Sequence, residues 1–215
     1  MNRREVLKNL GMGAGYVVVA PSVFSLLQSC KNNPDWEPNF LTAESGHALK
    51  EILEVILPSD DTPGANDLNI AQFIDSYMDR VAKDDEQRLF KTQADAFALS
   101  FRSQHDKDLT DGTPEDYEKT VATYLGANQE KRTKYDERLS ATQDPEGPES
   151  ENSEDNTDLE ANTYGYLHTI RDKAVWAWRN SEEVGENVFW YDPIPGAYKG
   201  CIPLEEADGG KIMSL

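Results

Sequence analysis

Cysteine and histidine are scarce in this sequence of 215 residues, which has two cysteines and three histidines. Cys30 and Cys201 are too few for a disulfide framework, which needs a denser set. His47, His105 and His168 have no second ligand at a metal-motif spacing such as H-x-x-x-H or C-x-x-C, and no C-x-x-C-H haem attachment occurs. These scarcities argue against a disulfide scaffold, a metal centre and a c-type haem.

Basic and apolar residues are also under-represented. The chain has 21 Lys and Arg against 40 Asp and Glu, a formal net charge of -19. Such a balance argues against nucleic acid and anionic lipid as direct partners, because both are polyanions. Hydrophobic content is 38%, below the roughly 45–50% typical of globular domains. Part of the chain is therefore expected to remain unpacked, around one modest core.

The first residues resemble an export signal. Arg3 and Arg4 are followed by an apolar residue, a leucine and a lysine, which resembles the twin-arginine signal that the translocase reads. The stretch 10–29 is weakly hydrophobic and ends in Leu-Leu-Gln-Ser before Cys30, which resembles a bacterial lipobox. We therefore interpret residues 1–29 as a twin-arginine lipoprotein signal and Cys30 as the lipidated first residue of the mature protein.

The alternative for this region is an uncleaved membrane anchor. Residues 10–29 are about long enough to span a bilayer. Three glycines and Pro21 weaken that interpretation, so we favour a signal. The glycines, at positions 11, 13 and 15, also match part of a dinucleotide fingerprint, but no strand precedes them.

After the signal, residues 30–41 read as a tether, and residues 42–215 as a single helical domain. Apolar residues at helical spacing predict a helix with Thr42 as its N-cap that ends at Pro58, a turn, and a second helix over about 70–81. The apolar face of the second helix includes Phe73 and Val81, and we expect it to be buried against other helices. Further helices are expected from about Asp84, where Gln87 stands in capping-box position, from Thr113 to Gly126, and over 159–180, with a polar loop over 105–112. Trp176 lies off the apolar face of the last helix, so it is either exposed or covered by the C-terminal segment. We predict an all-α fold: an irregular bundle of about five helices with an extended C-terminal strap.

Two segments depart from the helical pattern. Residues 143–160 hold eight acidic residues and no Lys, Arg or aromatic residue, so we expect an acidic mobile insert rather than a calcium loop. Residues 189–203 alternate aromatic residues with prolines and glycines, which forbids helix but argues against disorder. Such a strap lies either across its own core or across a partner, and the sequence leaves both open.

Three stretches together resemble the gluconate 2-dehydrogenase subunit 3 family. They are the Arg-Arg signal, the Ile-Leu-Pro-x-x-Asp-Thr-Pro-Gly-Ala turn starting at Ile56 with Phe-Ile-Asp after it, and Tyr-x-Pro-Ile-Pro-Gly-x-Tyr-x-Gly-Cys ending at Cys201. Two motifs supply the candidate partner-interface residues: Asp61, Thr62, Pro63, Gly64, Tyr191, Pro193, Pro195, Gly196, Tyr198 and Cys201.

The resemblance implies a non-catalytic accessory subunit. Family members accompany an exported FAD-dependent dehydrogenase subunit of the glucose–methanol–choline type that oxidises sugars or sugar acids, and a cytochrome c often takes the electrons. FAD is then expected in the partner and no cofactor in this chain. We expect the small subunit to support twin-arginine export, folding and membrane attachment on the periplasmic side of the cytoplasmic or outer membrane.

Other interpretations are weighed against this one. A stand-alone periplasmic lipoprotein that binds a small ligand is the main rival. A catalytic enzyme is disfavoured, because no acid–base or nucleophile constellation stands out. The adjacent carboxylates Asp60 and Asp61 fit turn hydrogen bonding better than catalysis, and Cys201 is expected to pack as a small buried hydrophobe. Tyr191 and Tyr198 serve equally well as partner anchors or as self-packing residues.

Overall fold

The computed structural model describes residues 36–143, 158–190, 196, 201–203, 205–206 and 210–212. The chain divides into two compact units, Met1–Glu37 and Pro38–Leu215, and the helices described below all belong to the second. The predicted signal with Arg3, Arg4 and Cys30, most of the tether, and residues 144–157 of the acidic insert lie outside the described residues. Those predictions stay predictions.

The described part of the second unit is all-α, as the sequence predicts, and it contains no strand. Its elements follow one another in this order: α2 (Ala43–Ile56), α3 (Ile70–Arg80), α4 (Asp84–His105), η1 (Leu109–Asp111), α5 (Pro114–Leu125), α6 (Gln129–Gln143), α7 (Leu159–Arg179) and η3 (Val184–Val188).

Two of the three helix caps that the sequence predicts are confirmed. The Thr42 hydroxyl accepts the Ser45 N–H at 3.1 Å, and Thr113 caps α5 with Pro at the first helical position. The predicted capping role of Gln87 is wrong. Glu86 instead accepts the N-cap N–H of Lys83, while the Gln87 amide donates to the Met78 carbonyl at 2.8 Å and so caps the end of the preceding helix.

Three elements, α6, η1 and η3, have no counterpart among the helices that the sequence predicts. Helix α6 is polar on nearly every side, and its one fully buried residue, Tyr135, stacks on Tyr164 of α7 with 4.9 Å between ring centroids. The short η1 turn buries Leu109 in a stretch that was expected to be a polar loop, and the Tyr117 hydroxyl donates to the Leu109 carbonyl at 2.6 Å. Single anchors of this kind leave no periodic apolar pattern.

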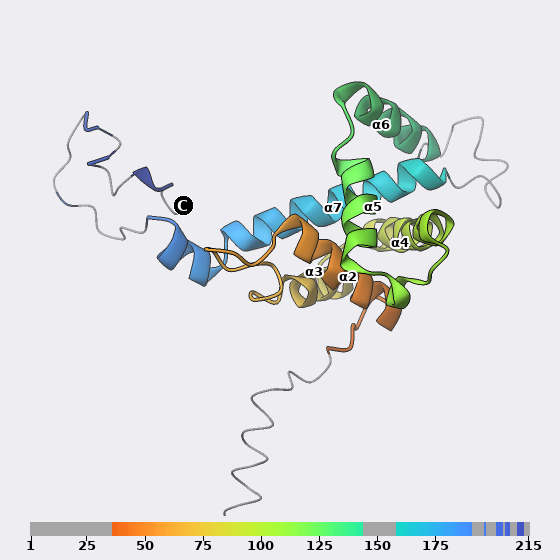
Figure 1. Cartoon of the computed structure of the whole chain (residues 1–215), viewed down its shortest axis with the longest axis horizontal. Helices are drawn as coiled ribbons and strands as arrows, with labels where there is room; N and C mark the ends of the chain where they lie inside the picture. The colour runs from red at the N-terminus through yellow and green to blue at the C-terminus, as the bar shows by residue number, and fades with distance from the viewer. Residues whose placement is uncertain are drawn as a thin grey trace, which may run out of the picture. The chain divides into compact units, whose positions relative to one another are not determined.

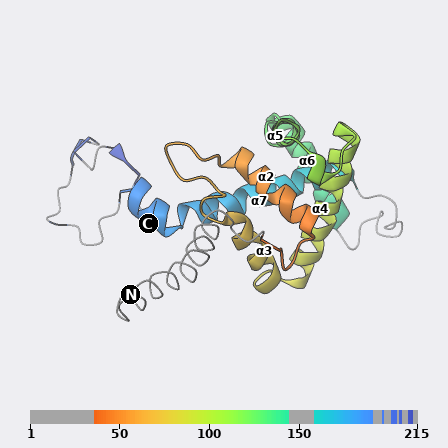
Figure 2. The ribbon, with the colours of Figure 1, turned by 60° about the horizontal axis from the view of Figure 1, so that its bottom comes forward.

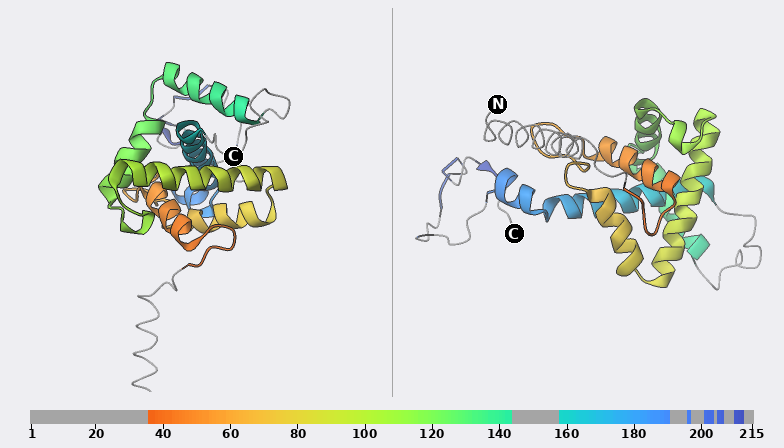
Figure 3. Two further views of the ribbon diagram at one scale, coloured as in Figure 1. Left: turned by 90° about the vertical axis from the view of Figure 1, so that its right-hand side faces the viewer. Right: turned by 90° about the horizontal axis from the view of Figure 1, so that it is seen from below.

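Helix α7 is the centre of the bundle, because α2, α3, α4, α5, α6 and η3 all pack against it (Figures 1 and 2). The view nearly along its axis shows the other helices arranged around it (Figure 3, left). Residues 161–167 are all buried, which is typical of a helix that is covered on every side. Gly165 allows the close approach of α4, since a Cβ there would lie 2.5 Å from the Gln93 amide nitrogen.

The predicted apolar face of α3 is only partly covered. Ile70, Ile74 and Met78 are buried, whereas Phe73 is 37% exposed and Val81 is 64% exposed. Val81 is the C-cap residue, where the chain leaves the helix, so its predicted burial is wrong. Phe73 is exposed for a different reason: it faces the C-terminal half of α7, which few other elements cover.

Candidate partner interface

The loop between α2 and α3 contains Asp61, Thr62, Pro63 and Gly64, the first group of predicted interface residues. The Asp60 carboxylate accepts hydrogen bonds from the Thr62 N–H at 2.9 Å and from the Thr62 hydroxyl at 3.0 Å, and these bonds lower the pKa of Asp60. Asp61 is exposed. The Asp60 carboxylate therefore forms a turn, as the sequence suggests.

Gly64 lets this loop close on itself. A Cβ at Gly64 would lie 2.5 Å from the Ser59 nitrogen and 2.8 Å from the Pro58 carbonyl carbon, and neither backbone atom can move aside cheaply. The Gly64 N–H donates to the Asp67 carboxylate at 2.8 Å, and the Ser59 side chain and this N–H lower the pKa of Asp67. The glycine in the motif is thus required by close packing of backbone on backbone.

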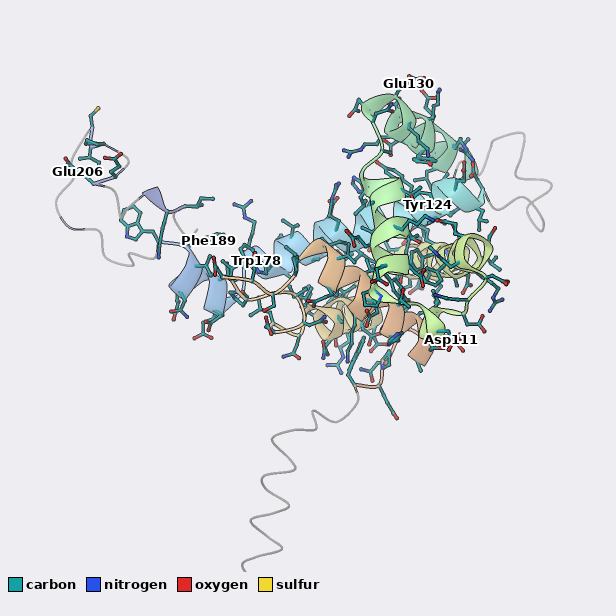
Figure 4. All side chains as sticks on the ribbon, viewed as in Figure 1. Asp111, Tyr124, Glu130, Trp178, Phe189 and Glu206 are labelled. Atoms are coloured by element: carbon teal, nitrogen blue, oxygen red, sulfur yellow. The ribbon has the colours of Figure 1, made fainter. Side chains whose placement is uncertain are left out.

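Trp178 connects the loop to the end of α7. Its indole N–H donates to the Pro63 carbonyl at 2.7 Å, across 115 residues of sequence. Its ring meets Phe189, just after η3, edge-on at 5.8 Å between centroids. Figure 4 shows Trp178 and Phe189 together at the junction of α7 and η3. The loop and the start of the C-terminal segment are therefore brought to one end of the domain.

An apolar groove lies beside this junction, between the start of α3 and the last turns of α7. Phe73 and Trp176 lie 5.7 Å apart between ring centroids, and the groove has a volume of about 270 Å³. Trp176 is 57% exposed. Of the two alternatives for this residue, exposed or covered by the C-terminal segment, the described residues leave it largely exposed. The groove is lined by Leu68, Ile70, Phe73, Trp176, Ala177, Asn180 and Ser181.

Asp75, the last residue of the Phe-Ile-Asp motif, ties the start of the domain to α3. Its buried carboxylate accepts the backbone N–H groups of Asn39, Phe40 and Leu41 at 2.7, 3.1 and 3.0 Å. Three such bonds satisfy a charge that would otherwise be costly to bury. The motif aspartate thus fixes where the chain enters the bundle, a role that sequence spacing alone could not reveal.

The second group of predicted interface residues is described only in part. Tyr191, Pro193, Pro195 and Tyr198 lie outside the described residues. Gly196 is exposed, and a Cβ there would meet no heavy atom within 4 Å. Cys201 is exposed, so its expected burial is wrong. The Trp190 N–H donates to the Ile212 carbonyl at 2.8 Å, which joins the strap to the C-terminal residues.

One polar cluster elsewhere resembles a catalytic arrangement. His105 lies 3.2 Å from the Asp116 carboxylate through Nδ1 and 2.8 Å from the Thr120 hydroxyl through Nε2. Thr120 is fully buried and donates to the Asp116 carbonyl, so no substrate can reach its hydroxyl. Lys107 bonds the same carboxylate at 2.6 Å and, with the Thr113 N–H, holds the pKa of Asp116 far below its usual range. The cluster joins the loop after α4 to α5.

Metal and membrane features were also sought in the described part of the chain. Among those residues, no three His, Cys, Asp or Glu side chains gather closely enough to hold a metal ion. None of the helices described is both long and apolar enough to cross a bilayer.

The described residues form an all-helical domain with an exposed aromatic groove at one end, which is the kind of surface that binds a partner. Comparison with known proteins identifies the family. A model of the gluconate 2-dehydrogenase subunit 3 family matches residues 43–196, and the chain belongs to this family. The searches of curated proteins and of solved structures returned no match. The chain is thus a subunit of a dehydrogenase complex.

The sequence predicts the loop but not the groove. Phe73 belongs to a predicted core face, and Trp176 lies off the apolar stripe of its helix, so neither residue indicates the other as a neighbour. An isolated exposed tryptophan near a chain turn carries no periodic signal, and its pairing with Phe73 depends on how α3 crosses α7. The available signal was compositional, since two of the four tryptophans occur within residues 176–178.

Proposed function

We propose that this chain is the non-catalytic accessory subunit of an exported FAD-dependent sugar or sugar-acid dehydrogenase of the glucose–methanol–choline type. The observation that carries the proposal is the family match, which covers the bundle from the start of α2 to Gly196 in the strap. In this proposal the partner binds FAD and performs the oxidation, and a cytochrome c subunit accepts the electrons. This chain supplies export, folding support and membrane attachment.

The proposed division of labour assigns separate tasks to separate parts of the chain. Arg3 and Arg4 would be read by the twin-arginine translocase, which carries folded cargo, so the partner would cross the membrane already bound to this chain. Cys30 would carry the lipid that holds the complex on the periplasmic side of the cytoplasmic or outer membrane. The helical domain would bind the flavoprotein.

The test is a native detergent purification of the tagged full chain from its own membranes, with an absorption spectrum and mass identification of bound proteins. We expect a yellow preparation with a flavoprotein at about one copy per chain. A colourless chain that elutes alone under gentle conditions would contradict the proposal and favour the stand-alone ligand-binding lipoprotein.

The export and anchoring parts are tested separately. Changing Arg3→Lys together with Arg4→Lys should leave both this chain and the flavoprotein in the cytoplasm, measured by cell fractionation. Cys30→Ala should abolish labelling by a radioactive fatty acid while leaving export intact. Continued export of the double variant would refute the twin-arginine interpretation, and persistent labelling would refute the lipobox.

The rival function, binding of a small polar ligand such as a sugar, has less support at the groove. Asn180 donates its amide to the Trp176 carbonyl at 2.7 Å, and Ser181 donates its hydroxyl to the Trp178 carbonyl at 2.8 Å. These donors are used within the helix end, so the groove offers a ligand mainly apolar and aromatic surface. Small-molecule sites normally combine apolar lining with a few polar groups that fix the orientation of the ligand, which makes this groove a poor match for a sugar site.

A further inference from the structure

The groove between α3 and α7 combines apolar lining with aromatic rings that the described residues leave open. Phe73 is 37% exposed and Trp176 is 57% exposed, although their rings lie in contact. Covering the exposed part of both rings would lower the free energy by on the order of 25 cal/mol for each Å² of apolar surface removed from water. Exposed Trp at the centre of such a patch is the side chain most enriched among residues that dominate binding energies.

Side-chain contacts also hold the residues next to the groove in place. The Lys173 ammonium lies 3.9 Å from the centroid of Tyr77, and the Tyr77 ring lies 6.1 Å from that of Phe73. Trp178, on the far side of α7, is held by the Pro63 carbonyl. The Phe73 ring is therefore packed between Tyr77 and Trp176, and Lys173 holds Tyr77, which lowers the entropy that Phe73 loses on binding.

Charged residues flank the lining residues of this groove in the sequence. Glu182 and Glu183 follow the lining residue Ser181, Asp67 precedes the lining residue Leu68, and all three are exposed; the exposed Arg179 precedes the lining residue Asn180. In the described part of the chain, neither Glu182 nor Glu183 has a cationic group within 4 Å. Three of these four flanking charges are therefore acidic, and we call Asp67, Glu182 and Glu183 the acidic rim of an otherwise apolar groove.

The charges discriminate among the occupants of such a groove. A second copy of this chain would bring another net charge of -19 against an acidic rim, and an anionic bilayer would be repelled in the same way. A partner with an apolar or aromatic side chain at its centre and Lys or Arg around it would be complementary in both shape and charge.

We infer that this groove, framed by Phe73 and Trp176, is the docking point for a protruding apolar or aromatic side chain of the catalytic dehydrogenase subunit, set among basic residues of that subunit. The inference rests on the proposed function, and it deepens that function by naming the surface and the chemistry of its partner. The acidic rim raises the association rate, and the aromatic pair Phe73 and Trp176 lowers the dissociation rate.

The test uses full-length chain and the flavoprotein that co-purifies with the wild type. Phe73→Ala and Trp176→Ala should each weaken binding of the purified flavoprotein at least about tenfold, measured by titration, and should lower the flavin absorbance per chain in material from membranes. Trp176→Phe should retain most of the affinity. The matched controls Val81→Ala and Leu99→Ala remove exposed apolar side chains elsewhere and should bind as the wild type does.

The rim is tested by changing Glu182→Gln together with Glu183→Gln. We expect slower association and a weaker dependence of the association rate on salt, with little change in dissociation. Thermal melting of every variant should stay close to that of the wild type, because the altered side chains are exposed.

The outcomes separate the inference from the function on which it rests. If the wild type binds the flavoprotein and both alanine variants bind it equally well, the inference fails and the proposed function stands. If the wild type binds no flavoprotein, both fail. Sedimentation that shows a wild-type dimer abolished by Trp176→Ala, or binding to anionic vesicles abolished by it, would also overturn the inference and assign the groove to a second copy or to a membrane.

Discussion

The two halves of α7 carry similar aromatic pairs in opposite surroundings. Phe97 of α4 meets Tyr166 at 5.6 Å between ring centroids, and Phe73 of α3 meets Trp176 at 5.7 Å. Phe97 and Tyr166 are each 1% exposed, whereas Phe73 and Trp176 are 37% and 57% exposed. Nearly equal contact geometry therefore occurs once inside the core and once at the surface.

Coverage by neighbouring elements, rather than the ring contact itself, therefore distinguishes the buried pair from the exposed pair. In the first half of α7, residues 161–167 are all buried, and burial raises the pKa of Tyr166 above its usual value. Around the second half, residues 171–180 include only one buried residue, Ala174. The same helix thus stabilises the domain with one half and offers a surface with the other.

The largest expected effect comes from the buried pair. Phe97→Ala should lower the free energy of unfolding by about 3–5 kcal/mol, because it leaves a cavity between α4 and α7. Phe73→Ala removes the same ring from the exposed pair and should cost about 1 kcal/mol or less. Denaturant unfolding of the full chain measures both. Equal losses of unfolding free energy would show that the two halves of α7 contribute alike to stability.

A smaller but clear effect is expected at the loop beside the groove. Gly64→Ala should destabilise the domain by about 1–3 kcal/mol, because the added methyl group meets backbone atoms that cannot yield. The matched control is Gly196→Ala, where space is open and the change should stay within about 0.5 kcal/mol. Calorimetric melting distinguishes them, and a neutral Gly64→Ala would mean that the loop relaxes freely.

The hydrogen bond from Trp178 to the Pro63 carbonyl gives a third test. Trp178→Phe keeps an aromatic ring against Phe189 but removes the donor, so we expect a loss of about 0.5–1.5 kcal/mol. Trp176→Phe serves as the control, and there we expect a change within about 0.5 kcal/mol. If the two variants have equal stability, Trp178 does not hold the loop.

The smallest effect is pH-dependent and concerns the polar cluster at the edge of the buried region. The Lys107 bond lowers the pKa of Asp116, so its contribution to stability is present at neutral pH and is lost as the pH falls below about 3.9, the usual value for Asp. Asp116→Asn should therefore flatten the decline of melting temperature in acid, and Lys107→Met should do so in part. An unchanged acid profile in both variants would exclude this linkage.

The bundle itself could be predicted from the sequence, because its helices start at strong caps and carry periodic apolar faces. Thr42, Thr113 and Pro114 marked helix starts that the structure confirms. The predicted start of the last long helix at residue 159 agrees with α7. Helix α6 could not be predicted, because its packing depends on Tyr135 and its other faces are polar.

The candidate site was predictable as a loop but not as a surface. The turn over Asp60 to Gly64 is formed by residues that are neighbours in the sequence, so their residue types predict it directly. The groove depends on a long-range crossing that brings residue 73 to residue 176 and residue 63 to residue 178. The buried Asp75 and the His105 cluster were missed for the same reason, since their partners are distant in the chain or set by the turn geometry.

We propose that this chain is the non-catalytic partner of a flavin dehydrogenase, and purification of the native complex is the decisive experiment. The measurement is the absorption spectrum of the full chain purified from its own membranes in mild detergent, together with the masses of the proteins present. We expect a flavin band and a flavoprotein in about equal amount to this chain. Purification of the chain alone, without flavin absorbance, would refute the proposed function.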